Sequence, residues 1–261
     1  IVMPQTLHFL LPCLSLVVKD VRVILLLNGA AQWEADQLKA RWPDLPQFRV
    51  ATLPHSSVNH GAMVNLLLRN NEQDFGLLDH DLYLFDTSAL AQLQFAEKQF
   101  LMCLWAETDP KSQWVYPLTH FLYCRVGVLR RLMKQYGVGA DLYRHVPEPA
   151  RSRLLELGLS AGHPLKSYHN FFDTLHVLIA LAYAEGLELC ELQIAEGGVY
   201  HVGGTSIGTY HTKDMFALYS HLRFLELSDD PQLRRRYAML AAPFRDSTEL
   251  RMRVQEYPEY E

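Results

Sequence analysis

Apolar residues in the first eighty positions fall into short runs separated by polar and turn-forming residues. Two continuous apolar runs, Leu7–Leu14 and Val21–Leu27, predict strands covered on both faces. Phe48–Thr52 and Phe75–Leu78 predict a third and a fourth strand. Between them, Ala31–Trp42 and Gly61–Leu68 predict helices. The alternation predicts an α/β fold with a mostly parallel central sheet flanked by helices, and ligands bound beyond the carboxyl ends of the strands.

The link between the first two predicted strands does not fit this scheme. Only Ser15–Asp20 separates them, whereas a parallel crossover needs about a dozen residues or more. Either these two strands are antiparallel, or a segment is missing, or the first strand is misplaced.

The rest of the chain is more helical. Asp173–Ala184 predicts a helix with Asp173 as its N-cap and Gly186 at its end. Further helices are predicted at Ala89–Leu104, Leu129–Tyr136, Arg151–Leu157 and Lys213–Leu227. We expect one domain over residues 1–227, followed by a charged helical tail over residues 228–261.

Charge and cysteine content narrow the class of protein. The net charge is −5 and the longest basic run is Arg234–Arg236, so a nucleic-acid partner is not expected. The four cysteines form no Cys-x-x-Cys pair, which favours reduced thiols in a cytoplasmic protein. The apolar stretch Leu7–Val18 is too short for a transmembrane helix. A peripheral membrane contact through the tail stays open.

The strongest chemical signal is Asp79-His80-Asp81, directly after the apolar run Phe75–Leu78. Side chains at i and i+2 of an extended segment point to the same side. Two adjacent carboxylates repel each other unless a cation or a proton lies between them. Hard oxygen ligands favour Mg²⁺ or Mn²⁺, and such ions commonly bridge protein carboxylates to a diphosphate. The alternative is a pair of solvated loop acids.

The stretch from Asn59-His60-Gly61, through Asn65, to Phe75–Asp86 resembles glycosyltransferases of the GT-A fold, namely family 2 and its relatives. The resemblance implies a nucleotide-sugar donor and a Rossmann-like nucleotide-binding half. By it, Asp79 lies near the ribose and Asp81 binds the cation on the diphosphate. Asn59, His60, Gly61 and Asn65 become candidate donor contacts.

A second segment, Asn170–Thr174, resembles the one that holds the catalytic acid of that family, and it implies Asp173 as the base. An inverting transfer needs a base that takes the proton of the acceptor hydroxyl as that hydroxyl attacks the anomeric carbon. Asp173 as a simple helix cap is the alternative, and a retaining transfer stays open.

Further candidates follow from the same resemblance. His201 matches a strand-end histidine that completes the metal shell, and Gly203 and Gly204 would let the backbone approach phosphate oxygens. Asn28 lies where the base or ribose is often held. Aromatic side chains that could stack on an acceptor glycan lie in the sequence between the strand before Asp79 and the helix predicted at Asp173: Trp105, Trp114, Tyr116, His120 and Tyr123.

The sequence therefore predicts a metal-dependent glycosyltransferase that moves a sugar from a nucleotide diphosphate to an acceptor hydroxyl. Two alternatives stay open. A sugar nucleotidyltransferase shares a similar core, but the Pro12–Ser15 segment lacks the glycine-rich basic loop typical of that class. A degenerate, non-catalytic fold that binds a nucleotide or a protein partner is the other. The donor sugar, its base and the acceptor are not indicated.

Overall fold

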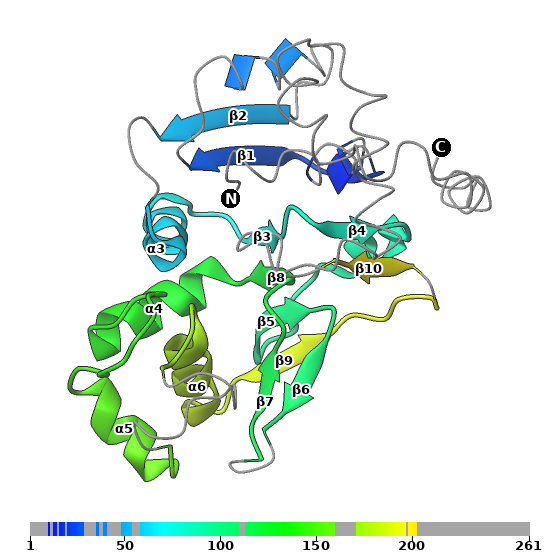
Figure 1. Ribbon diagram of the computed structural model, residues 1–261. Coiled ribbons are helices and arrows are strands. Elements are labelled where there is room, and N and C mark those ends of the chain that lie inside the picture. Colours follow the sequence, from blue (N-terminus) through cyan, green and yellow to red (C-terminus); the bar gives the residue numbers. More distant parts are fainter. Residues whose placement is uncertain are drawn as a thin grey trace, which may run out of the picture. The chain divides into compact units, whose positions relative to one another are not determined.

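The computed structural model describes residues 10, 13–14, 16–18, 20–28, 35–36, 39–40, 48–53, 58–109, 113–159, 171–196 and 198–202 (Figure 1). The chain divides into two compact units. Unit 1 comprises Ile1–Ser57, His80–Thr87 and Ala195–Glu261, and unit 2 comprises Val58–Asp79 and Ser88–Ile194. The chain therefore passes from unit 2 into unit 1 between Asp79 and His80, inside the acidic motif.

In its described residues, unit 1 contains two small pairs of strands. β1 (Val23–Asn28) and β2 (Phe48–Leu53) run parallel, with Val23 opposite Phe48, so both predicted strands are confirmed. β4 (Leu82–Leu84) and β10 (Val199–His201) run antiparallel, with Tyr83 opposite Tyr200. β4 is buried throughout and begins directly after Asp81, so the acidic motif is anchored on this side by a buried strand.

The predicted strand Leu7–Leu14 is wrong. Leu10, Cys13, Leu14 and Val17 are helical, and the amide of Val18 donates to the carbonyl of Leu14 at 2.9 Å. These four residues are buried and recur at i, i+3, i+4 and i+7, the spacing of one helix face. The short link to β1 thus joins a helix to a strand, and no crossover between strands is needed there.

Unit 2 is built on a four-stranded sheet with the order β3 (Phe75–Leu78), β8 (Phe121–Cys124), β5 (Gln99–Cys103) and β9 (Glu188–Glu191). β8 is antiparallel to both β3 and β5, and only β5 and β9 are parallel. The expected mostly parallel sheet is therefore wrong in the described part of the chain, although the α/β class is correct.

The reason lies in the segment predicted as the helix Ala89–Leu104. It forms a 3₁₀ helix, η2 (Thr87–Gln92), and then the strand β5. Phe100 to Cys103 are all buried, as in a strand covered on both faces, and this continuous apolar run hides the period that separates strand from helix. A hairpin of β6 (Ala106–Thr108) and β7 (Val115–Pro117) follows.

Helices accompany the sheet of unit 2, and Figure 1 shows α4 and α6 beside it. α3 (His60–Asn70), α4 (Val126–Tyr136) and α5 (Ala150–Glu156) confirm three predicted helices. α6 (His176–Ala184) is buried from His176 to Ala182 and presses Tyr183 edge-on against Phe100 of β5, with ring centroids 5.8 Å apart.

α6 begins later than the sequence predicts. Leu175, not Asp173, is the N-cap, whereas Gly186 follows the helix with a φ of 72° as expected. The predicted helix Lys213–Leu227 and the tail over residues 228–261 lie outside the described residues. No helix in the described ranges has the length and apolar character that a membrane span requires.

Candidate functional site

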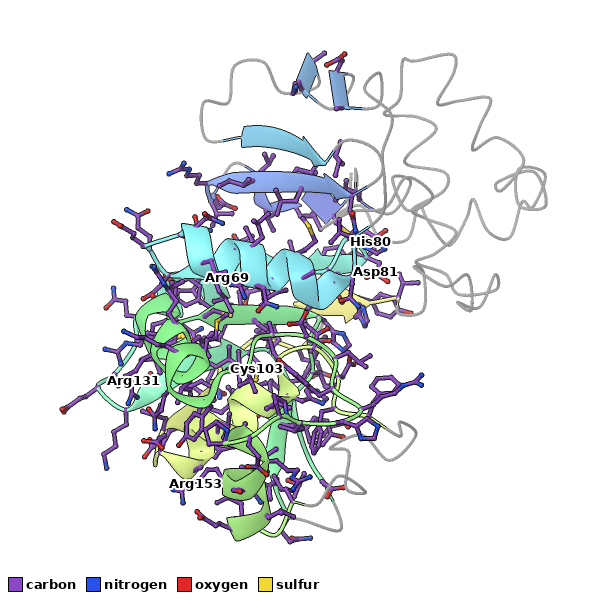
Figure 2. The ribbon with its side chains drawn as sticks, turned by 90° about the vertical axis from the view of Figure 1, so that its left-hand side faces the viewer. Arg69, His80, Asp81, Cys103, Arg131 and Arg153 are labelled. Atoms are coloured by element: carbon purple, nitrogen blue, oxygen red, sulfur yellow. The ribbon has the colours of Figure 1, made fainter. Side chains whose placement is uncertain are left out.

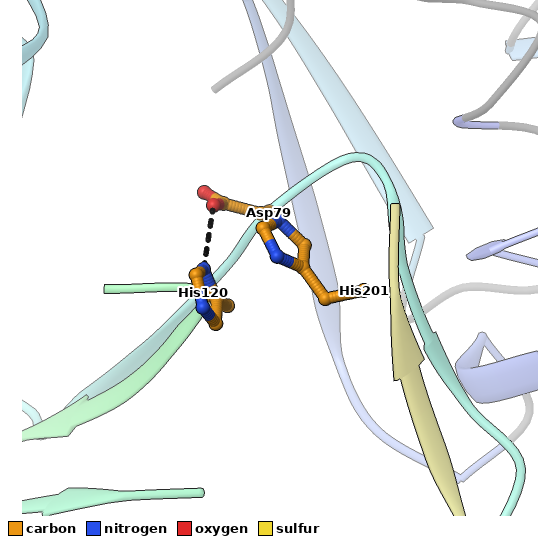
Figure 3. Close-up of side chains that lie close together, drawn as sticks. All are labelled: Asp79, His120 and His201. Atoms are coloured by element: carbon orange, nitrogen blue, oxygen red, sulfur yellow. Dashed lines mark ion pairs between the residues drawn. The ribbon is translucent and has the colours of Figure 1, made fainter. Parts of the chain in front are cut away.

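Asp79 and His120 form a pair in unit 2. The antiparallel register of β3 and β8 sets Leu78 opposite Phe121, so the next residue out on each strand also meets its counterpart. The Asp79 amide donates to the His120 carbonyl at 2.8 Å, and Asp79 Oδ2 lies 3.9 Å from His120 Nδ1 (Figure 3). The Asp79 side chain is 37% exposed, so it can accept a ligand.

Asp81 and His201 form a second pair, in unit 1. His201 ends β10 and lies opposite Leu82, the first residue of β4. His201 Nε2 lies 3.2 Å from Asp81 Oδ1, and the Val202 amide donates to the Asp81 carbonyl at 3.2 Å. The Asp81 side chain is only 5% exposed (labelled in Figure 2). A buried carboxylate needs a partner that offsets its lost hydration, and this imidazole provides one.

A single residue, His80, separates the two carboxylates along the chain, and it is buried. Two residues of extended chain span at most about 7 Å between Cα atoms. The covalent chain alone therefore keeps the Cα atoms of Asp79 and Asp81 within about 7 Å of each other.

His60 lies within electrostatic range of two carboxylates of unit 2, those of Asp79 and Asp173. Desolvation lowers the pKa of His60, and the negative charges of Asp79 and Asp173 act in the opposite direction. The His60 side chain is still exposed at the surface, so the desolvation comes from nearby protein atoms that displace only part of the water around it. Asp79 and Asp173 are 94 positions apart in sequence, yet both act on this one imidazole.

The residues before His60 and along α3 also have roles in the fold. Asn59 caps α3, and its side-chain oxygen accepts from the Gly61 amide at 2.8 Å. Asn65 is buried and bonds to the chain at Ala140 and Asp141. A donor contact by any of these residues stays a prediction.

The remaining candidates are placed unevenly. Asn28 ends β1 and is buried. Gly203 and Gly204 lie outside the described residues. Among the aromatic candidates, Trp105 meets His120 edge-on with centroids 5.7 Å apart, and so lies on the Asp79 side of unit 2.

The other aromatic candidates have packing roles. Trp114 packs on Tyr183, Tyr116 donates to Glu107, and Tyr123 stacks on Phe95. These contacts hold the hairpin and the sheet of unit 2 in place. Of the five, His120 pairs with Asp79, and Trp105 contacts His120.

Sequence reasoning missed the pairing of His120 with Asp79. His120 counted only as a ring that could stack on an acceptor. Its place beside Asp79 depends on the antiparallel pairing of β3 with β8, two strands that lie more than forty residues apart. No local signal carries this register.

One comparison with known proteins gives a match. A family model described as the StrH glycosyltransferase N-terminal domain matches residues 4–129. The chain is thus similar to a glycosyltransferase-related family over slightly less than half its length. The matched segment includes His60, Asp79, Asp81 and His120 but neither Asp173 nor His201. No curated protein and no solved structure matches.

Proposed function

We propose that this protein is a metal-dependent glycosyltransferase that moves a sugar from a nucleotide diphosphate to an acceptor hydroxyl. The observation that carries the proposal is the partly exposed Asp79 carboxylate, which lies 3.9 Å from His120 Nδ1 directly after β3. The charges of Asp79 and Asp173 also both reach His60 in unit 2. A donor-side carboxylate and a base must lie near each other, because the acceptor attacks the carbon that the diphosphate leaves. The similarity of residues 4–129 to a glycosyltransferase domain supports the same activity.

The proposed cation ligands are Asp79, Asp81 and His201, with His120 as a fourth. Asp79, His120 and His201 each offer one ligand atom, and Asp81 follows Asp79 by two residues. A mixed set of carboxylate oxygens and imidazole nitrogens suits Mn²⁺ better than Mg²⁺, which prefers oxygen ligands and water. When bound, the cation would neutralise the charge of the leaving diphosphate.

Asp173 is the proposed base. Its carboxylate would take the proton from the acceptor hydroxyl while that oxygen attacks the anomeric carbon, which gives inversion. In the structure its Oδ1 accepts from the Thr174 amide at 2.8 Å. The ionised form of the carboxyl group is the form that can take a proton.

The first test is calorimetric titration of UDP and of GDP, each with Mn²⁺ and with EDTA. We expect binding that needs the cation and that Asp81→Ala abolishes. Glu72→Ala is the matched control, because Glu72 is an exposed acid close to the motif in sequence. Absence of binding for both nucleotides with Mn²⁺ would overturn the metal–diphosphate assignment.

The second test separates a transferase from a non-catalytic binder. Release of the nucleoside diphosphate from its sugar conjugate is followed for the wild type and for Asp173→Asn. Loss of a general base lowers the rate by about 10²–10⁴-fold, and nucleotide binding should stay unchanged. Tight binding by a wild-type protein that releases no product would favour the non-catalytic alternative.

A further inference from the structure

Asn65 is a buried polar residue in the middle of α3, and both ends of its carboxamide are bonded to one distant loop. Its Oδ1 accepts from the Ala140 amide at 2.6 Å, and its Nδ2 donates to Asp141 Oδ2 at 2.6 Å. A buried carboxamide with each end matched in polarity fixes its partner closely, because a shift of the loop breaks both bonds.

Two glycines let this loop lie directly on α3. A Cβ on Gly61 would stand 2.7 Å from the Asp141 Cα and 2.8 Å from the Ala140 oxygen. A Cβ on Gly139 would stand 2.5 Å from Asn65 Oδ1. Both approaches are shorter than carbon atoms tolerate, so only glycine fits at these positions. The loop is thus packed backbone to backbone on α3 at Gly61, and its Gly139 backbone lies against the Asn65 side chain.

The same loop holds the segment that bears Asp173. The Leu175 amide donates to the Ala140 carbonyl at 3.1 Å, and Phe172 and Tyr143 exchange two backbone bonds of 2.9 Å each. Asp173 lies between these anchors. Ala140 connects Asn65 to the Asp173 segment, because its amide donates to the Asn65 side chain and its carbonyl accepts from the Leu175 amide.

The backbone at Leu175 is strained in a way that indicates a firm hold. Its φ is 69°, in the left-handed region that costs a leucine roughly 1–2 kcal/mol. Such a conformation persists only where the surroundings impose it. Here the bond to Ala140 and the burial of the Leu175 side chain impose it.

We propose that Asn65 is a positioning residue: through the loop Gly139–Tyr143 it sets the place of Asp173 relative to the N-terminus of α3, where His60 lies. The inference rests on the proposed function, in which Asp173 is the base. It also gives Asn65 a role different from the donor contact that the sequence suggests.

The hydrogen bond from Asn65 to Asp141 predicts that two substitutions, one in each residue, have unequal effects. Asn65→Asp places a second carboxylate against Asp141 and removes the donor, so the loop must move. Asp141→Asn keeps an oxygen that can accept from Asn65, so the loop stays. Combining the two restores a donor and an acceptor in reversed order. Asn70→Asp is the control, because Asn70 is an exposed amide on the same helix and bonds only locally to Leu66.

The first readout is the release of UDP or GDP from its sugar conjugate, the assay used above for Asp173→Asn. A displacement near 1 Å of a catalytic group lowers the rate by about a hundredfold. We expect a loss of that order in kcat for Asn65→Asp, with an unchanged KM for the donor. Asp141→Asn, the double variant and Asn70→Asp should stay near the wild-type kcat. An unchanged kcat in folded Asn65→Asp, or a double variant as slow as the single one, would overturn the inference.

The second readout does not need activity. Amide hydrogen exchange of Phe172 and Leu175 reports directly on their bonds to the loop. We expect faster exchange at both amides in Asn65→Asp and recovery in the double variant. Unchanged exchange in Asn65→Asp would refute the positioning role of Asn65 even if the protein is a transferase. Changed exchange in a protein that neither binds a nucleotide nor releases it from a sugar conjugate would support the positioning role and reject only the proposed function.

Discussion

The two carboxylate–histidine pairs use the same residue types but differ in burial and in geometry. In unit 1 Asp81 is 5% exposed and lies 3.2 Å from His201, whereas in unit 2 Asp79 is 37% exposed and lies 3.9 Å from His120. The first pair is a close contact shielded from water, and the second is long and open. Asp79 and Asp81 are therefore expected to contribute differently to the free energy of unfolding when no ligand is bound.

This difference follows from the strands on either side of the motif. Asp81 leads into β4, which is wholly buried, so its side chain is drawn inside with the strand. Asp79 leaves β3, whose residues are half-buried or exposed. Removing one partner of a buried polar contact lowers the free energy of unfolding more than removing one partner of an exposed contact, because the remaining group stays desolvated.

The largest expected effect is on stability without metal. In EDTA, Asp81→Ala should lower the free energy of unfolding by about 1–3 kcal/mol, because it removes the buried acceptor that faces His201 Nε2 and leaves a cavity in its place. Asp79→Ala should lower it by less than about 1 kcal/mol, as expected for an exposed pair. Urea unfolding followed by circular dichroism measures both, with Glu72→Ala as the control. Equal losses for Asp79→Ala and Asp81→Ala would contradict the contrast between the pairs.

A bound cation should remove this contrast. Mn²⁺ at a hundred times its dissociation constant should raise the free energy of unfolding of the wild type by about 2.7 kcal/mol. Both Asp79→Ala and Asp81→Ala should lose that increment, because both carboxylates are proposed ligands. The same urea titration with Mn²⁺ in place of EDTA measures it. If Asp79→Ala keeps the full increment, Asp79 is not a ligand.

The sequence predicts the pieces of unit 2 better than their assembly. α3, α4 and α5 follow from apolar periodicity, and β3 follows from its apolar run into the acidic motif. The sheet order does not follow, because β8 pairs with both β3 and β5 through contacts that no local pattern encodes. Leu7–Leu14 fails for another reason: a short apolar run is ambiguous between strand and helix.

The candidate site shows the same division. Asp79 and Asp81 are found from their place after an apolar run, and their roles stay predictions. The nearness of Asp173 to His60 depends on the loop Gly139–Tyr143, which the sequence leaves without a predicted element. Asn65 shows the limit most clearly, since an amide on a helix gives no sign of the two bonds that it makes 75 and 76 positions away.

A smaller effect separates the two imidazoles. His120→Gln should weaken Mn²⁺ binding about tenfold, which is about 1.4 kcal/mol, and leave stability in EDTA almost unchanged because its pair is open. His201→Gln should weaken binding similarly and also destabilise the metal-free protein, because Asp81 is buried against it. Calorimetric titration of Mn²⁺ and urea unfolding in EDTA give the two numbers. A His120→Gln variant as unstable as His201→Gln would show that exposure does not set the difference.

The smallest expected effect is a local opening of unit 1, which can be measured by the rate at which buried cysteines react with a labelling reagent. Cys13 is buried against Tyr83 of β4 in unit 1, whereas Cys103 and Cys124 are buried in unit 2. Burial raises the pKa of both Cys103 and Cys124 to about 12, so at pH 8 only about one in 10⁴ of each is the reactive thiolate. Both thiols should therefore stay inert unless unit 2 opens.

In a Cys190→Ser background, which removes the half-exposed thiol, Asp81→Ala should loosen β4 and speed the labelling of Cys13 by a disulfide reagent. A rise of about tenfold corresponds to about 1.4 kcal/mol of easier local opening. Asp79→Ala should leave the rate of Cys13 unchanged, and labelling of Cys103 and Cys124 should stay slow in both variants. Mass spectrometry of the labelled peptides assigns each rate. Because labelling follows local opening, acceleration at Cys103 as well as Cys13 would mean that Asp81 stabilises more than unit 1, and the contrast between the two pairs would then be one of strength and not of place.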